Sequence, residues 1–372
     1  MLEMAITAAM FRDVYGVKKG DRIIICSRNL LSYYTVFWAC HLLGTVTALV
    51  NAWLPLDALR HSEQIEPIAA DLKRASSASG YLVLQDHEGK GHWEGWDIWS
   101  EAFLEYHKDP GKILRNDPRI IPEDNATIIF TSGTTGLPKG VLSTQRVFLT
   151  FLFNVRSIFC VSASTVRRDY IRRGVPIPSS LASGTNNGIL LSSPLFHATG
   201  TSATLTGAFY GTKIILMIKW NVVEVLCPLR WKHIQRHDYR LCKEEGVISL
   251  GGVPLLITDL ADSPLSGFPI EVITIRGAPV MLSILHRSKE AFPHATLGQG
   301  YGSTKTNVTS VGFSEYDLSG FITPVNDILI MKDNVRAASG VVGEIWLRGL
   351  NMMKGYHRDQ ASTAATDKVC EG

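Results

Sequence analysis

The stretch from Thr131 to Gly140, Thr-Ser-Gly-Thr-Thr-Gly-Leu-Pro-Lys-Gly, restricts what this chain can fold into more than any other segment. It follows a short apolar run, Thr127 to Phe130, that predicts a buried strand. Glycines let a backbone approach a ligand closely, and successive exposed N–H groups form a concave site for anions. Hydroxyl side chains and the ammonium of Lys139 add further donors. The segment therefore predicts a loop that binds the β- and γ-phosphates of a nucleotide.

Two widespread phosphate-binding motifs do not fit this loop. A Walker loop needs Gly, four residues and then Gly-Lys-Ser/Thr, but Pro138 stands five places after Gly133. The Gly-x-Gly-x-x-Gly fingerprint of dinucleotide-binding folds is also absent from the loop. A solvated turn is the simpler alternative, because turns use the same residue types for local reasons. Ten consecutive residues that all suit a phosphate favour the nucleotide loop over the turn.

Length and composition exclude several classes of protein. A chain of 372 residues exceeds one ordinary core and predicts two or more subdomains. Its 45% hydrophobic and 19% charged residues are typical of a soluble globular protein. A net charge of +3 does not indicate binding to nucleic acid or to a membrane surface. The six cysteines form no Cys-x-x-Cys pair, which argues against a zinc site.

No segment suggests secretion or membrane insertion. The most apolar run, Leu30 to Leu43, is shorter than the ~20 residues that a membrane-spanning helix needs. The start of the chain has no basic region before its apolar residues, so we expect no signal peptide. The last three residues, Cys-Glu-Gly, are not a peroxisomal signal. We therefore expect a cytoplasmic protein without a transmembrane segment.

Strand and helix patterns alternate along most of the chain. Asp21–Cys26, Leu30–Leu43 and Thr45–Val50 predict a βαβ unit. Further strands are expected at Gly188–Ser192, Thr212–Ile218, Gly246–Leu250, Ile270–Arg276, Ala295–Gln299, Asp327–Met331 and Glu344–Arg348. Further helices are expected at Glu94–Phe103, which carries an aromatic stripe, and at Val147–Cys160, Ala203–Tyr210 and Val280–Phe292. This order predicts an α/β fold, with layered α/β/α subdomains and parallel or mixed sheets.

Two segments depart from this regular order. Ser162–Gly188 is polar, basic and contains prolines, which predicts a surface excursion. Residues 227–243 are basic and have no clear period. His233 and His237 stand four residues apart there, a spacing that could hold a metal on a helix. No third ligand is evident nearby, so a solvated loop is favoured over a metal site.

Three glycine-rich segments follow predicted strands: Thr131–Gly140, Gly277–Pro279 and Gly300–Lys305. In α/β sheets, ligands bind at the carboxyl ends of strands. Each of the two later segments alone could be a tight turn. Together with the phosphate loop, they predict one site that surrounds a nucleotide.

These segments resemble the motifs of the adenylate-forming (AMP-binding) superfamily, which includes acyl-CoA synthetases, 4-coumarate–CoA ligases, luciferases and peptide-synthetase adenylation domains. Thr131–Gly140 resembles the phosphate loop of that family, and Gln299-Gly-Tyr-Gly-Ser-Thr304 its aromatic-Gly-x-Thr-Glu motif. Gly343–Gly349 and Asn351–Tyr356 resemble the segment before its ribose-binding aspartate. Segments around Val147–Pro178, Gly251–Pro254 and Thr323–Asp333 look most like fatty-acyl-CoA ligases of the fungal and bacterial type.

The resemblance implies roles for individual residues. Lys139 would hold the departing pyrophosphate, Thr304 would bond the α-phosphate, and His197 would border the acyl pocket, which makes these three the candidate catalytic residues. Tyr301 would stack on adenine. The residues implied in nucleotide binding are Thr131, Ser132, Gly133, Thr134, Thr135, Gly136, Lys139, Gly277, Ala278, Pro279, Gln299, Gly300, Tyr301, Gly302, Ser303 and Thr304.

The implied reaction joins a carboxylic acid, expected to be a fatty acid, to coenzyme A through an acyl-adenylate. ATP, Mg²⁺ and coenzyme A are the implied cofactor and co-substrates. An acyl-carrier or polyketide synthase partner is an alternative acceptor, and no nucleic-acid partner is expected. Chain length and pathway stay open.

The chain departs from the family pattern in three places. Lys305 stands where the family has a glutamate that helps to hold Mg²⁺, so no metal ligand is expected among these motifs and adenylation is expected to be impaired. An AMP-binding domain is expected over residues 1–350, in two or three subdomains and incomplete at its start, with 351–372 leading towards a hinge. The small C-terminal domain is expected to be absent. A catalytically inactive nucleotide-binding homologue and a non-functional fragment are therefore the alternatives to an acyl-CoA ligase.

Overall fold

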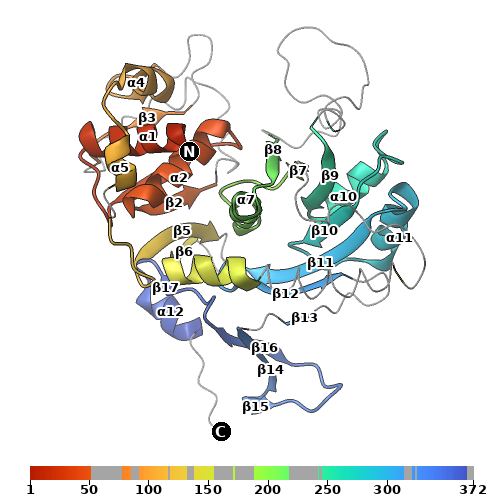
Figure 1. Cartoon of the computed structure of the whole chain (residues 1–372). Coiled ribbons are helices and arrows are strands. Elements are labelled where there is room, and N and C mark those ends of the chain that lie inside the picture. Colours follow the sequence, from red (N-terminus) through yellow and green to blue (C-terminus); the bar gives the residue numbers. More distant parts are fainter. Residues whose placement is uncertain are drawn as a thin grey trace. The chain divides into compact units, whose positions relative to one another are not determined.

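The computed structural model describes residues 1–51, 78–84, 92–115, 118–131, 138–154, 171, 188–217, 242, 245–313, 321–322 and 325–366 (Figure 1). The chain divides into two compact units, Met1–Gln145 and Arg146–Gly372. Each unit is described by itself below. Predicted segments at 162–188 and 227–243, with His233 and His237, fall almost entirely outside the described residues.

The sheet of the first unit contains the predicted βαβ unit. Strand β1 (Arg22–Cys26) pairs in parallel with β2 (Val46–Val50), and helix α2 (Leu31–Leu43) connects them. Strand β2 pairs in parallel with β5 (Asn125–Thr131), and β5 pairs antiparallel with β6 (Lys139–Thr144). The carboxyl ends of β1, β2 and β5 therefore lie at one edge of the sheet, and the predicted phosphate loop begins there.

Helices of the first unit bury small and aromatic side chains. Helix α1 (Leu2–Asp13) packs on α2, burying Ala8 and Met10, while α2 buries Tyr33 and Phe37. Short helices α4 (Trp99–Glu105) and α5 (Gly111–Arg115) and the two-residue strands β3 (Leu82–Val83) and β4 (Asp97–Ile98) complete the described part of this unit (Figure 1).

The helix predicted over Glu94–Phe103 is only partly correct. Residues 97 and 98 form strand β4, which pairs with β3, and the helix begins at Trp99. Trp96 instead packs against Tyr81, with ring centroids 4.8 Å apart, and Trp99 packs against Phe103 at 5.2 Å. Of the three predicted stripe residues, only Trp99 and Phe103 share the helix, whereas Trp96 stands before it.

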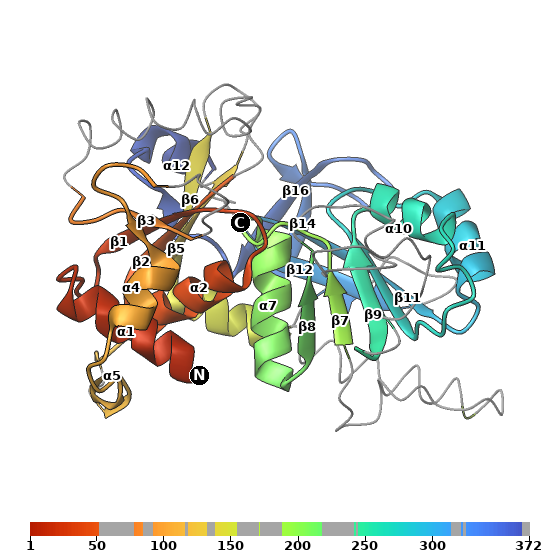
Figure 2. The ribbon, with the colours of Figure 1, turned by 90° about the horizontal axis from the view of Figure 1, so that it is seen from above.

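A mixed sheet forms the centre of the second unit, in the order β13-β12-β11-β10-β9-β7-β8 among the described strands. Strands β8 (Lys213–Leu216), β7 (Gly188–Leu191), β9 (Val247–Gly252), β10 (Val272–Arg276) and β11 (Thr296–Ser303) are parallel to one another. Strands β12 (Asn307–Phe313) and β13 (Phe321–Ile322) continue the sheet in antiparallel pairing. Figure 2 shows β8 beside β7 and β7 beside β9 in this sheet.

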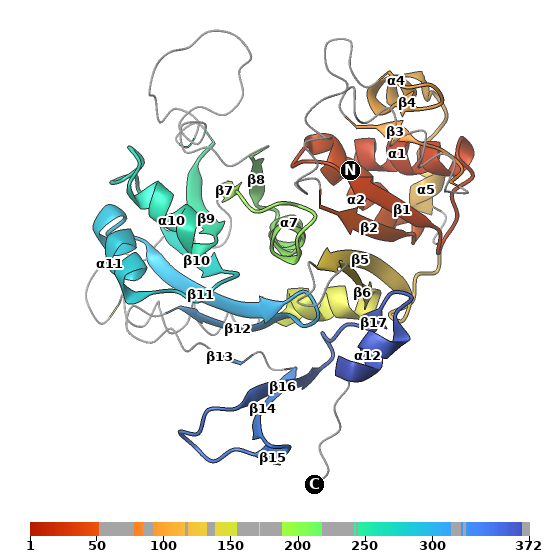
Figure 3. The same cartoon turned by 180° about the vertical axis from the view of Figure 1, so that it is seen from behind.

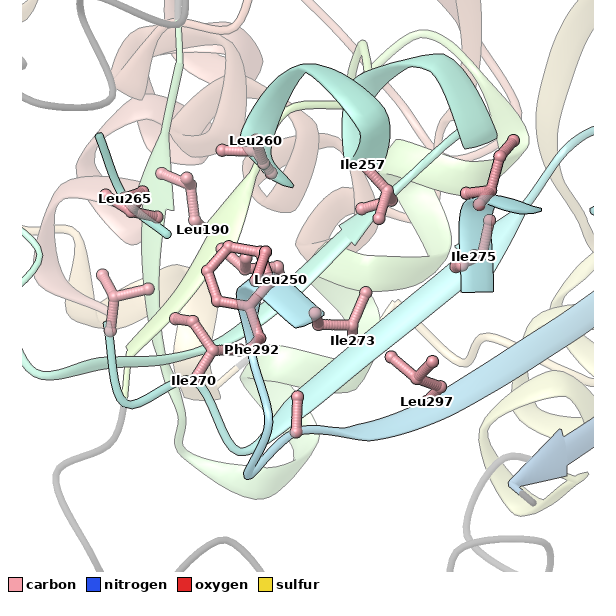
Figure 4. Close-up of a cluster of buried hydrophobic side chains, with 14 of the residues drawn as sticks. Leu190, Leu250, Ile257, Leu260, Leu265, Ile270, Ile273, Ile275, Phe292 and Leu297 are labelled. Carbon is pink, nitrogen blue, oxygen red and sulfur yellow. The ribbon is translucent and has the colours of Figure 1, made fainter. Parts of the chain in front are cut away.

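Helices α10 (Pro254–Ala261) and α11 (Leu282–Ala291) pack against each other and share one core with this sheet. Ile273 and Ile275 of β10 point into that core, where they meet Ile257 of α10 and Leu285 of α11. Leu297 of β11 joins the same cluster (Figure 4). These alternate residues of the strands therefore mark the face of the sheet that the two helices cover.

The last described elements form a smaller group in the second unit. Strand β14 (Asn326–Lys332) pairs antiparallel with β15 (Val335–Arg336) and with β16 (Glu344–Gly349), close to the two strands predicted here (Figure 3). Strand β17 (Gly355–Tyr356) and helix α12 (Gln360–Thr366) follow.

Several boundaries differ from the sequence predictions. Helix α7 (Ala198–Tyr210) begins five residues before the predicted Ala203, directly after the turn that carries His197. Residues 145–154 form the described part of the helix predicted over Val147–Cys160. Among the described helices, none combines the length and apolar character needed to cross a bilayer. The α/β class with parallel and mixed sheets is confirmed.

Candidate functional site

The predicted phosphate loop connects β5 and β6 of the first unit. Thr131 and Lys139 are paired across the two strands at the base of this loop, and the Thr131 hydroxyl donates to the Lys139 carbonyl oxygen at 3.3 Å. Residues 132–137, which include Ser132, Gly133, Thr134, Thr135 and Gly136, lie outside the described residues. The structure thus places the two ends of the loop at the carboxyl edge of the sheet, and its anion-binding role stays a prediction.

The second predicted segment leaves the carboxyl end of β10 in the second unit. Gly277, Ala278 and Pro279 are all exposed. Gly277 has a φ of +89°, a left-handed conformation that favours glycine. A Cβ at this position would also lie 3.2 Å from Cγ1 of Val253. The turn is therefore exposed at the carboxyl end of β10, and its packing on an adenine base stays a prediction.

The third predicted segment is mostly strand rather than turn. Strand β11 does not end at Gln299 as predicted but continues to Ser303, because Gly300 and Tyr301 pair with β12. The register shifts between Tyr301 and Gly302, and the chain then turns through residues 304–306. Thr306 holds this turn, since the Ser303 N–H donates to its hydroxyl oxygen at 3.2 Å. Thr304 is partly exposed at the turn, and the Tyr301 side chain is 48% exposed.

Strand pairing brings the second and third segments together. Strands β10 and β11 are parallel neighbours, and Arg276, which precedes the Gly277 turn, is in register with Gly300. The exposed Gly277–Pro279 backbone and the exposed Tyr301 ring thus lie at adjacent strand ends of one sheet. The second unit thus contains two of the three segments that were predicted to surround a nucleotide.

Lys305 occupies the turn after β11, where a glutamate was expected from the family resemblance. Its ammonium lies 5.9 Å from the centre of the Tyr356 ring. Its carbonyl oxygen accepts a hydrogen bond from the Met353 N–H at 2.7 Å, and the Asn351 amide donates to the carbonyl oxygen of Thr306. The turn is therefore tied to residues 351–356, and Lys305 is oriented by an aromatic face.

His197 lies at the N-terminus of α7, in the turn after β7. Its N–H donates to the Pro194 carbonyl oxygen at 3.1 Å, and its carbonyl oxygen accepts from the Thr201 N–H at 2.9 Å. The side chain keeps an exposed part, while the surrounding protein removes enough water to lower the pKa of the imidazole below its usual range. The place of this ring at the border of an acyl pocket stays a prediction.

Arg276 is a site residue that the sequence analysis did not select. It is the last residue of β10, and its Nε is buried without a hydrogen-bond partner among the described residues. Burial lowers the pKa of its guanidinium to about 10, which still leaves it charged at neutral pH. The available signal was a lone arginine that ends an apolar strand, Val-Ile-Thr-Ile-Arg, directly before Gly-Ala-Pro.

The described residues do not offer a ready site for a bound divalent cation. No group of three or more His, Cys, Asp or Glu side chains in the described part of the chain is arranged to hold one. Lys305 presents a cation where a carboxylate oxygen would be needed. The residues at this turn do not fit a protein-held Mg²⁺.

Comparison with known proteins relates this chain to one family. A family model described as AMP-binding enzyme matches residues 3–357. The 2-succinylbenzoate–CoA ligase of Bacillus velezensis is 28% identical over 372 residues, covering 96% of this chain and 65% of the relative. The 4-coumarate–CoA ligase-like protein 4 of Oryza sativa is 25% identical over 380 residues, covering 96% of this chain and 62% of the relative. The chain thus spans less than two thirds of the length of these relatives.

Solved structures support the fold. The o-succinylbenzoate CoA synthetase of Bacillus subtilis, in complex with its acyl-adenylate intermediate, superposes with a TM-score of 0.70 at 21% identity, covering 99% of this chain and 67% of that one. At this identity the likeness concerns the fold alone.

Proposed function

Because this chain belongs to the AMP-binding enzyme family, we propose that it binds ATP and a carboxylic acid and takes part in forming an acyl-CoA through an acyl-adenylate. In the first half-reaction a carboxylate oxygen attacks the α-phosphorus of ATP, and the bond to the departing pyrophosphate breaks. In the second half-reaction the sulfur of coenzyme A attacks the acyl carbonyl carbon, and AMP leaves. Both relatives compared above are named as CoA ligases.

One observation carries the proposal. The exposed backbone of Gly277–Pro279 and the exposed ring of Tyr301 lie at the ends of adjacent parallel strands, within the range that the family model matches. The carboxyl edge of an open α/β sheet is the usual place for such a ligand. Adenine would stack on Tyr301 and lie against the Gly277–Pro279 backbone. Thr304 would donate its hydroxyl to an α-phosphate oxygen.

The remaining residues act by positioning and by charge. Lys139 stands at the base of the predicted phosphate loop and would neutralise the departing pyrophosphate. His197, as a neutral ring, would border the acid without forming an ion pair with its carboxylate. Mg²⁺, when bound to the nucleotide, would supply further positive charge at the phosphates.

The identity of the acid is a separate matter. The aliphatic acid expected from the sequence resemblance stays a prediction, because the printed names of the relatives include 2-succinylbenzoate and 4-coumarate. Coenzyme A as the acceptor, in place of a carrier protein, rests on the names of the relatives alone.

A second candidate function follows from Lys305. An ammonium held over the Tyr356 ring cannot supply a carboxylate ligand for Mg²⁺. This observation favours a nucleotide-binding homologue with little or no adenylation activity.

Two measurements on the purified chain separate these candidates. A folded nucleotide binder gains thermal stability in the presence of ATP, whether or not it catalyses a reaction. Exchange of labelled pyrophosphate into ATP, measured with a panel of carboxylic acids, reports the first half-reaction. Acid-dependent exchange supports the ligase, stabilisation without exchange supports the inactive homologue, and the absence of both contradicts the two proposals.

A further inference from the structure

Arg276 differs from the other arginines of the second unit whose partners are described. Arg287 forms an ion pair with Asp262, and Arg348 pairs with Asp327 at 2.8 Å, both at the surface. Arg276 has no ion pair or hydrogen bond through its side chain among the described residues, although its Nε is fully buried. The Nε group has therefore lost its hydration without a hydrogen bond in exchange from the described residues.

Two glycines of the neighbouring strands lie beside the Arg276 side chain. Ile273 and Ile275 of β10 point into the core under α10 and α11, so Arg276 lies on the opposite face of the strand. Its Nη2 is 3.3 Å from the place that a Cβ of Gly251 would take. Its Cβ and Cδ are 3.5 and 4.0 Å from the corresponding place at Gly300. A side chain at position 251 would press on the guanidinium, whereas one at position 300 would make ordinary contact with the stem of the arginine.

The guanidinium is directed away from the strand end. Gly251 is in register with Thr274, two residues before Arg276 on β10. Since a strand rises about 3.3 Å per residue, the guanidinium reaches back roughly 7 Å along the sheet from the end of β10. A group bound to it would lie below the Gly277–Pro279 turn, to which the nucleotide is assigned. The residue as a whole is partly exposed, so a ligand can reach it.

We propose that Arg276 binds a second carboxylate of the acid substrate, and hence that this chain takes a dicarboxylic acid. The inference rests on the proposed function for the site of the reacting carboxyl group. The planar fork of a guanidinium matches the two oxygens of a carboxylate and forms two parallel hydrogen bonds. The position of Arg276 below the turn favours the far end of the acid over a phosphate at the strand tips.

The test compares acids of equal chain length that differ only in the second carboxylate. Binding of suberate and octanoate, and of dodecanedioate and dodecanoate, is measured by calorimetry on the purified chain. The same titrations are made with Arg276→Gln and with Arg287→Gln, which removes an exposed arginine of the same unit. ATP and inorganic phosphate are titrated in parallel.

We expect at least one dicarboxylate to bind tenfold more tightly than its matched monocarboxylate. Arg276→Gln should abolish that difference, while Arg287→Gln should keep it and ATP affinity should stay within twofold in both variants. Equal binding of every matched pair to the original chain would overturn the proposal. So would a tenfold loss of ATP or phosphate affinity in Arg276→Gln, because the anchored anion would then be a phosphate.

Thermal unfolding supplies an independent readout that a structural role would not produce. Replacing Arg276, whose buried Nε has no partner among the described residues, with an apolar side chain of similar length removes the cost of that desolvation. Arg276→Met should therefore raise the Tm of the ligand-free chain and cancel the Tm increase caused by the dicarboxylate. A lower Tm for ligand-free Arg276→Met would show that Arg276 stabilises the fold and would overturn the proposal. If the chain binds the dicarboxylate but does not exchange pyrophosphate into ATP, that result would contradict the proposed reaction and not this inference.

Discussion

At the scale of single residues, Lys305 is where this chain departs most clearly from the pattern it resembles. Its ammonium lies against the Tyr356 ring, and its backbone is tied to Met353. The consequence is chemical rather than structural, because the turn keeps its hydrogen bonds whichever side chain stands at position 305. A lysine here supplies positive charge but no oxygen ligand.

Replacing Lys305 by glutamate should therefore increase Mg²⁺-dependent exchange of pyrophosphate into ATP. We expect an increase of about tenfold or more. The gain of one Mg²⁺ ligand, or the loss of one positive charge that repels Mg²⁺, should lower the activation free energy by about 1.4 kcal/mol or more. Lys332→Glu, which makes the same charge change elsewhere in the second unit, should have no such effect. Unchanged exchange in a variant whose ATP-dependent stabilisation is normal would show that Lys305 does not limit the reaction.

Arg276 shows what a residue-by-residue reading of the sequence cannot reach. The lone arginine at the end of an apolar strand is visible in the sequence. Its side chain lies beside Gly251 and Gly300, which belong to the strands on either side. Those pairings join positions far apart in the chain, so only the folded sheet shows that no described residue pairs with the guanidinium.

At the scale of secondary-structure elements, helix α7 is held to the turn before it by close backbone packing. A Cβ at Gly200 would lie 2.0 Å from the carbonyl oxygen of Pro194 and 3.0 Å from Cα of Leu195. The same turn carries His197. The position of this imidazole therefore depends on a glycine in the first turn of the helix.

Gly200→Ala should destabilise the chain by about 2 kcal/mol, because the backbone of the turn must move. Helix propensity alone predicts the opposite sign, a gain of about 1 kcal/mol when alanine replaces glycine. The midpoint of urea unfolding distinguishes the two. Ala208→Gly, on the exposed side of α7, serves as the control and should cost about 1 kcal/mol. A stabilised Gly200→Ala variant would contradict the close packing described here.

Helix α2 carries a histidine whose protonation should make the fold sensitive to acid. The His41 ring packs edge-on against Phe37, with centroids 4.6 Å apart, and burial lowers the pKa of His41 to about 4. The unfolded chain takes up this proton near pH 6.5, whereas the folded chain resists it until about pH 4. Stability from this group is therefore complete above pH 6.5 and is lost as the pH falls towards 4, by up to about 3 kcal/mol.

Urea unfolding at pH 7.5 and pH 5 measures this loss. His41→Gln should reduce the difference between the two pH values, because the glutamine does not titrate. His294→Gln, which changes an exposed histidine, should leave the difference as it is. An equal pH dependence in the original chain and in His41→Gln would assign the acid sensitivity to other groups.

Elements with strong local patterns were predicted well, whereas one strand end and one helix start were placed wrongly. The apolar runs of β1, α2 and β2 match the predicted ranges within a residue, because buried strands and helices select their residues locally. The end of β11 was placed too early, since its glycines suggested a turn while the antiparallel partner β12 keeps them in the sheet. The start of α7 was missed because Ala-Thr-Gly-Thr-Ser has a weak helical pattern.

At the scale of the whole molecule, two compact units each carry part of the predicted site. The first unit holds Thr131 and Lys139 at the base of the phosphate loop, and the second holds the Gly277 turn, Tyr301 and Thr304. The fold class followed from the alternation of strands and helices, and the resemblance to one family is confirmed by a match over residues 3–357. That both units contact one nucleotide is part of the proposed function.

The substrate was the least predictable property. Composition and periodicity describe the core and carry no information about a bound acid. The family resemblance suggested an aliphatic acid, and the second carboxylate proposed for Arg276 is encoded by no motif, since it rests on a buried Nε with no partner among the described residues.

Equilibrium binding of ATP to the purified chain, to Tyr301→Phe and to Tyr301→Ala tests the central claim most directly. Tyr301 lies with its ring exposed at the end of β11, beside the Gly277 turn, and stacking on adenine needs a ring but not its hydroxyl. The account predicts saturable binding, a change of less than twofold for Tyr301→Phe and a loss of about tenfold for Tyr301→Ala. Equal ATP affinity in folded Tyr301→Ala, or no saturable binding to the original chain, would contradict it.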